Sequence, residues 1–186
     1  WCKISANIIK NKSIDTELKV RISYLSSFGE LLESFFLDEN QSENPKLIQA
    51  IKDAEKYNSW FSKKNIINAL KYWMVKLRKD TLETWVSKYN LQNVNYKVAI
   101  ITAGNFPLAG LHDLICVIIT GNKAIIKPSS DDKILINFFV EFLYKEFPET
   151  REIIEITSEK LGDFDKVIAT GSNNTFNYFE YYFRDK

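Results

Sequence analysis

The chain has 186 residues, of which 45% are hydrophobic, so it is long enough to bury a core in one or two compact units. Its 25 basic residues nearly balance its 24 acidic residues, and no basic stripe typical of nucleic-acid-binding proteins is visible. No apolar run reaches the roughly 18 residues of a membrane span, and we expect no signal peptide. We therefore expect a cytoplasmic protein without a membrane span or a nucleic-acid partner. The chain begins with Trp1 rather than Met, so we expect the natural protein to start further upstream.

The first half of the sequence, residues 1–92, is predicted to be mainly helical, because its apolar residues recur at intervals of three and four. The expected helices cover about residues 15–37, 47–54, 66–77 and 80–88, and a polar linker follows at 90–95. A polar stretch at 38–45 separates the first two helices, and Asp80 is the expected N-cap of the fourth.

In the second half, residues 93–186, short apolar strands alternate with helices, a pattern typical of βαβ units and a parallel sheet. The expected strands cover residues 98–101, 124–126, 153–156 and 166–169, and the expected helices start at Pro107, Asp131 and about Asn173. We therefore predict an α/β fold in which a helical segment is followed by an incomplete, Rossmann-like parallel sheet that binds a cofactor. The last helix carries aromatic residues on several faces, and we expect another subunit or a downstream part of the protein to cover them.

Polar or glycine-bearing turns follow three of the expected strands, at the ends where open α/β sheets bind ligands. The candidate site residues on these turns are Asn105, Lys127, Ser129, Ser130, Gly171 and Ser172. A lysine and two hydroxyls at the start of a helix can hold cofactor hydroxyls or phosphate, and a glycine lets the backbone approach a pyrophosphate. Each turn taken alone could equally be an ordinary solvated turn. No Gly-x-Gly-x-x-Gly motif occurs, so a dinucleotide would bind by another arrangement.

Asn105 has two interpretations that position alone leaves open. Its side-chain amide could donate a hydrogen bond to an oxyanion during acyl transfer, or it could cap the helix expected from Pro107. His112, the single histidine, could approach a substrate or be structural. Cys116 stands among apolar neighbours, and burial there should raise its pKa, so we do not expect it to be a nucleophile. Cys2 and Cys116 are the two cysteines of the chain, which are too few for a disulfide or zinc framework, and we predict no metal site.

Together these turns resemble the aldehyde dehydrogenase superfamily. The motifs Asn105-Phe106-Pro107, Lys127-Pro128-Ser129 and Thr170-Gly171-Ser172 occur in the order and at the intervals of that superfamily. Within it, the chain is most similar to the LuxC-type acyl-CoA reductases, over residues 57–61, 103–108, 111–114, 168–174 and 178–183. The resemblance implies that the first motif supplies an oxyanion amide, that the second contacts the cofactor ribose and that the third contacts its pyrophosphate.

The resemblance also implies an activity: NADPH- or NADH-dependent reduction of an acyl-CoA, or of an acyl-carrier thioester, to the aldehyde through a cysteine acyl-enzyme. Ser130 stands where aldehyde oxidisers usually carry a glutamate that binds the ribose hydroxyls, and this favours NADPH. The family's nucleophilic cysteine follows the third motif, so we expect it downstream of this chain, and we expect the fragment alone to be inactive. A homo-oligomer or a C-terminal domain should complete the enzyme. Two alternatives stay open: an NAD-dependent aldehyde-oxidising dehydrogenase, and a non-catalytic nucleotide-binding or assembly module.

Overall fold

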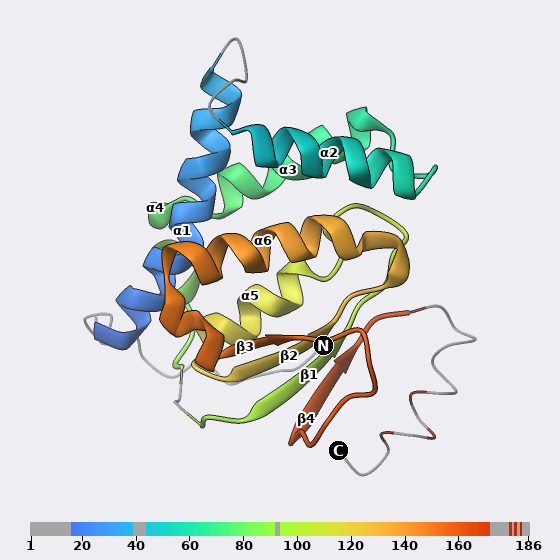
Figure 1. Ribbon diagram of the computed structural model, residues 1–186. Coiled ribbons are helices and arrows are strands. Elements are labelled where there is room, and N and C mark those ends of the chain that lie inside the picture. Colours follow the sequence, from blue (N-terminus) through green and yellow to red (C-terminus); the bar gives the residue numbers. More distant parts are fainter. Residues whose placement is uncertain are drawn as a thin grey trace.

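The computed structural model describes residues 16–38, 44–91, 94–171, 179, 181 and 183. Four helices form an outer layer: α1 (Thr16–Leu37), α2 (Pro45–Tyr57), α3 (Lys63–Lys76) and α4 (Lys79–Val86). Two further helices, α5 (Leu111–Ile119) and α6 (Lys133–Glu146), lie between this layer and a β-sheet (Figure 1). The predicted α/β class, with a helical N-terminal part, is therefore confirmed.

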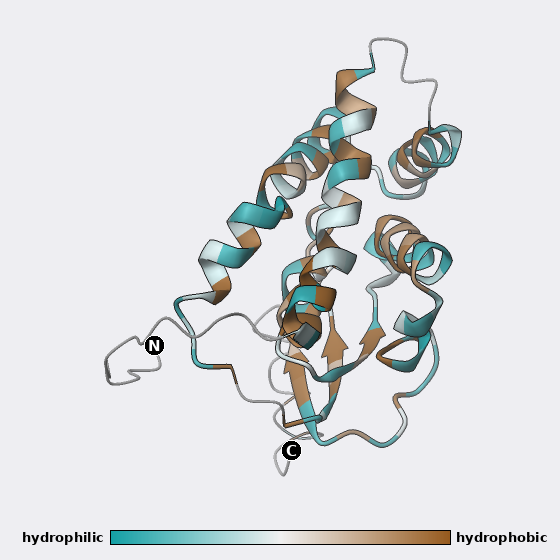
Figure 2. Ribbon diagram, turned by 90° about the vertical axis from the view of Figure 1, so that its left-hand side faces the viewer, coloured by the Kyte–Doolittle hydropathy of each residue, from teal (hydrophilic) through white to brown (hydrophobic). Residues whose placement is uncertain are grey.

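The sheet has four strands: β1 (Lys97–Ile101), β2 (Lys123–Lys127), β3 (Ile154–Ile156) and β4 (Lys166–Ala169). Their order is β3-β2-β1-β4 and every neighbouring pair is parallel, as the alternating pattern predicts. Figure 2 shows the strands as mostly hydrophobic, which suits strands that are covered by helices. The chain moves outward from β1 to β3 and then returns to place β4 on the other side of β1. This reversal creates a topological switch point between β1 and β4, where open α/β sheets bind ligands.

One apolar core joins the helical layer to the helices on the sheet. Phe28 of α1 lies against three rings of α6, with centroid distances of 4.9 Å to Phe139, 5.3 Å to Phe142 and 6.1 Å to Phe138. Rings at such distances and angles stabilise each other beyond the area that they bury. The packing fixes α1 across α6, while the division of the chain near residue 92 stays a prediction.

Several local predictions about helix starts are wrong. Residues 107–110 form a turn instead of the first helical turn, because Leu108 has a φ of 62°, which an α-helix does not accommodate. Asp80 is not an N-cap, since α4 begins one residue earlier, after Arg78. Asp131 does not cap α6 either: Asp132 occupies the cap position and makes no side-chain cap bond. The helix expected from about Asn173 lies almost wholly outside the described residues, as do Cys2 and Ser172.

Candidate active site

The carboxyl ends of three neighbouring strands lie side by side at one edge of the sheet. Ile101, the last residue of β1, is in register with Lys127 at the end of β2. The same residue is in register with Ala169 at the end of β4. The three turns that the sequence singles out therefore leave the sheet at the same level, on both sides of the switch point.

The first of these turns is the segment 102–110, which we call the β1 loop. Asn105 lies exposed in this loop, and its amide has no hydrogen-bond partner among the described residues. The N-cap of α5 is Gly110, so the capping interpretation of Asn105 is wrong. The loop folds back on its own start, since a Cβ on Gly110 would lie 2.7 Å from the Cβ of Thr102. Only glycine fits there without displacing a neighbour.

Two contacts join the β1 loop to the segment 128–132, which we call the β2 turn. The backbone N–H of Ser129 donates to the hydroxyl oxygen of Thr102 at 3.0 Å. Gly104 approaches the turn so closely that an added Cβ would lie 2.8 Å from the Cβ of Asp131 and 2.9 Å from that of Ser129. A glycine is required here because the side chains of Ser129 and Asp131 already occupy the space that a Cβ would fill.

The β2 turn contains the other predicted polar groups. Lys127, directly before it, is half-buried, and its ammonium has no ion-pair or hydrogen-bond partner within the described part of the chain. The Ser129 hydroxyl accepts the N–H of Asp131 at 3.3 Å and so caps the short 3₁₀ helix η1 (Ser130–Asp132). Ser130 is exposed, with its hydroxyl 3.4 Å from an Asp131 carboxylate oxygen. Lys127 is therefore the side chain of this group that is left available for a ligand.

The end of β4 is tied to α5 across the switch point. The Thr170 hydroxyl donates to the Asp113 carboxylate at 3.2 Å. Gly171 follows and is exposed. This bond places the backbone of Gly171 beside the start of α5, at the edge where the β1 loop also lies.

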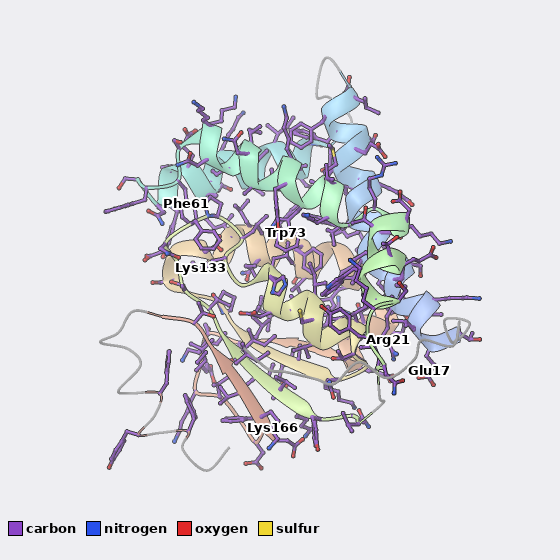
Figure 3. All side chains as sticks on the ribbon, turned by 180° about the vertical axis from the view of Figure 1, so that it is seen from behind. Glu17, Arg21, Phe61, Trp73, Lys133 and Lys166 are labelled. Atoms are coloured by element: carbon purple, nitrogen blue, oxygen red, sulfur yellow. The ribbon has the colours of Figure 1, made fainter. Side chains whose placement is uncertain are left out.

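An apolar cavity of about 400 Å³ opens between α3 and the β1 loop. Its lining residues are Ala69, Tyr72, Trp73, Phe106, Pro107, Leu108, Ala109 and His112. Figure 3 shows Trp73 projecting from α3 toward α5. Phe106, the residue after Asn105, is 53% exposed at the cavity. A cavity of this size and lining suits a hydrocarbon chain better than a charged group.

The sequence matches the family described as acyl-CoA reductase (LuxC) over residues 24–178. The chain belongs to this family. The match runs from α1 through the turn after β4 and includes every described residue at the sheet edge, so the resemblance inferred from the motifs is confirmed. A search of curated proteins finds no match.

Cys116 and His112 of this LuxC-family chain lie on one face of α5. Burial, and next the nearby Asp113 carboxylate, raise the pKa of the Cys116 thiol to about 11, which keeps it protonated near neutral pH. Both ring nitrogens of His112 lie 3.8 Å from its sulfur. The imidazole is largely exposed and also lies 3.6 Å from an Asp113 carboxylate oxygen. A protonated thiol is a poor nucleophile, as the sequence predicts for Cys116.

The described residues hold no group of three or more His, Cys, Asp or Glu side chains that could bind a metal ion. Among the helices that the structure describes, none is both long and apolar enough to cross a membrane.

Sequence reasoning missed one residue of this edge, Asp132. Its side chain is 1% exposed, and one carboxylate oxygen accepts the N–H of Ala109 in the β1 loop at 2.9 Å. Burial raises the pKa of Asp132 to about 7, although hydrogen bonds from the backbone of Leu108 and Ala109 oppose the shift. The signal in the sequence is the pair of adjacent aspartates, Asp131 and Asp132, of which the cap prediction uses only the first.

Proposed function

We propose that these residues form the cofactor-binding edge of an enzyme that reduces an acyl thioester to the aldehyde with NADPH. Membership of a family of acyl-CoA reductases supports the acyl-CoA substrate. The observation that carries the cofactor assignment is the register of Ile101 with Lys127 and with Ala169. It puts the three motif-bearing turns at one switch point, which is the usual dinucleotide position in such sheets.

The residues at this edge fit a dinucleotide. Lys127 is half-buried, and its ammonium, without a partner among the described residues, can bind a hydroxyl or phosphate oxygen. Gly171 is exposed and has no side chain to block its backbone. Ser130 brings no negative charge toward a 2′-phosphate, which supports NADPH over NADH. When bound, the dinucleotide supplies the hydride that reduces the acyl group.

Among the residues of this chain, Asn105 acts on the reacting carbonyl. A cysteine thiolate from outside these 186 residues attacks the thioester carbonyl, and negative charge develops on the carbonyl oxygen. The unpaired Asn105 amide donates a hydrogen bond to this oxygen and stabilises it. The apolar cavity beside Phe106 receives the acyl chain.

The first experiment replaces Asn105 in the full-length protein. Asn105→Ala should lower kcat for acyl-CoA reduction by about 10²–10³-fold, because one oxyanion donor is lost. The dissociation constant for NADPH should not change. Asn137→Ala, at an exposed position of α6, is the matched control and should retain full activity. Unchanged turnover of Asn105→Ala would remove this residue from the mechanism.

The second experiment tests the cofactor and the direction of the reaction. Fluorescence titration of the full-length protein with NADPH and NADH should show tighter binding of NADPH. Lys127→Gln should weaken that binding by about 10–100-fold, the effect of one charged hydrogen bond. Lys123→Gln, at the opposite end of the same strand, should not. Faster oxidation of free aldehyde with NAD than reduction of acyl-CoA would favour a dehydrogenase instead.

A further inference from the structure

Asp132 is an unusual residue to bury without a cation. The described structure buries four polar or charged residues, namely Ser26, Thr102, Asp132 and Thr150, and Asp132 alone among them is ionisable. It has no ion pair within 4.0 Å in the described part of the chain, and its Oδ1 is buried without any hydrogen-bond partner. Burying an unpaired carboxylate is costly, so a residue in this position needs a reason beyond stability.

The other carboxylate oxygen holds a strained part of the β1 loop. Oδ2 accepts the N–H of Ala109 at 2.9 Å, and the backbone of Leu108 also hydrogen-bonds the carboxyl. Leu108 has a φ of 62° and is 1% exposed, so its side chain is fixed in the core while its backbone is left-handed. Such a backbone is strained for a residue with a side chain and persists only where its surroundings hold it.

Asp132 therefore completes a set of contacts that fixes both ends of Asn105. Upstream, Gly104 packs against the β2 turn, and Thr102 accepts the N–H of Ser129. Downstream, the carboxylate of Asp132 binds the N–H groups of the strained turn. Asn105 lies between these two attachments and makes no side-chain hydrogen bond of its own among the described residues. Its position relative to Lys127 is set by them.

We propose that Asp132 is a positioning residue, whose carboxylate holds the β1 loop so that the Asn105 amide faces the reacting carbonyl. The proposal rests on the oxyanion role given to Asn105 above. Asp132 itself does not touch the substrate, because its carboxylate is enclosed between the loop and the start of α6. It acts by keeping Asn105 in place before the charge develops, and a displacement of about 1 Å at such a group can lower the rate 10²-fold.

A double-mutant cycle in the full-length enzyme tests this. Asp132→Asn keeps the shape of the side chain but replaces the charged acceptor of the loop N–H groups with a neutral amide oxygen, which binds them more weakly. It should lower kcat about 10–100-fold while KM for acyl-CoA changes little. In an Asn105→Ala background the same change should alter kcat by no more than about twofold, because there is no amide left to position. Asp53→Asn, at an exposed position of α2, is the control and should change neither constant.

Hydrogen exchange supplies a readout that does not depend on activity. In Asp132→Asn the amides of Leu108 and Ala109 should exchange faster, while those of α3 should not. Asp132→Ser, a smaller side chain, serves as the second variant if Asp132→Asn does not fold. Equal losses of kcat in both backgrounds, or unchanged exchange in the β1 loop, would overturn the positioning role. Unchanged turnover of Asn105→Ala alone would instead overturn the proposed function, and the exchange result would still report whether Asp132 holds the loop.

Discussion

Burial has opposite consequences in the outer helical layer and at the carboxyl edge of the sheet. In α1–α4 the buried side chains are apolar apart from Ser26 and the hydroxyl of Tyr24, which donates to Glu149. Burial of the apolar groups stabilises the fold because they leave water. At the sheet edge, burial encloses the carboxyl group of Asp132 and the left-handed backbone of Leu108. Both features lower stability, and costly local features of this kind gather where a protein positions a reacting group. The difference separates the part of the chain that holds the fold from the part that we propose performs the chemistry.

The largest effect is expected from the contact between α1 and α6. Phe28→Ala removes a fully buried ring from a cluster of three partners and should lower the free energy of unfolding by about 3–5 kcal/mol. Urea unfolding of the full-length protein measures this change. Val20→Ala, at an exposed position of the same helix, is the control and should cost less than about 0.5 kcal/mol. A small effect of Phe28→Ala would show that the two layers are not held together by this cluster.

The sequence predicts the two regions unequally, for a physical reason. The helices of the outer layer repeat a burial pattern every three or four residues, so their existence follows from local spacing. The β1 loop is fixed by contacts between distant residues: Thr102 with Ser129 and Ala109 with Asp132. Leucine usually continues a helix, so nothing in the sequence indicates that Leu108 has a left-handed backbone. For this reason the sequence predicts a start of α5 that is too early. Motif composition points to Asn105 and Lys127 because the chemistry proposed for them is carried by residue type. It gives no signal for a residue that would act through the loop.

A second prediction concerns the pH dependence of stability that Asp132 causes at the sheet edge. The pKa of Asp132 is near 3.8 in the unfolded state and about 7 in the folded state. At pH values between these two, the side chain is protonated to a greater extent in the folded state than in the unfolded one. Stability from this group is therefore present below about pH 4 and is lost as the pH rises toward 7. Its neighbours in sequence, Asp131 and Lys133, are exposed, and Lys133 lies over the Tyr57 ring, so the change belongs to Asp132.

The measurement compares the free energy of unfolding of the wild type and Asp132→Asn from pH 4 to pH 8. The variant should gain stability relative to the wild type as the pH rises, by on the order of 2–4 kcal/mol over this range. A difference that stays constant with pH would mean that Asp132 has the same pKa in the folded and unfolded states. Burial of this carboxyl would then not destabilise the sheet edge.

A third prediction tests the close approach of the β1 loop and the β2 turn. Gly104→Ala places a Cβ 2.8 Å from that of Asp131, and relieving the clash should cost about 1–3 kcal/mol and weaken NADPH binding. Gly162→Ala is a matched control, because a Cβ there meets no atom within 4 Å. Fluorescence titration and urea unfolding of both variants measure the two effects. Equal results for the two glycines would show that the loop and the turn can separate freely.

The smallest effect is expected from a pair of helix caps, one in each region. The Asn44 side chain accepts the N–H of Leu47 at 2.9 Å at the start of α2, and Ser129 accepts the N–H of Asp131 at the start of η1. Asn44→Ala should lower the free energy of unfolding by about 1 kcal/mol and leave NADPH binding unchanged, since α2 lies in the outer layer. Ser129→Ala should cost no more than that in stability but should weaken NADPH binding, because it loosens the β2 turn that follows Lys127. If Asn44→Ala weakened NADPH binding as much as Ser129→Ala does, the outer helical layer and the sheet edge would not have the separate roles argued above.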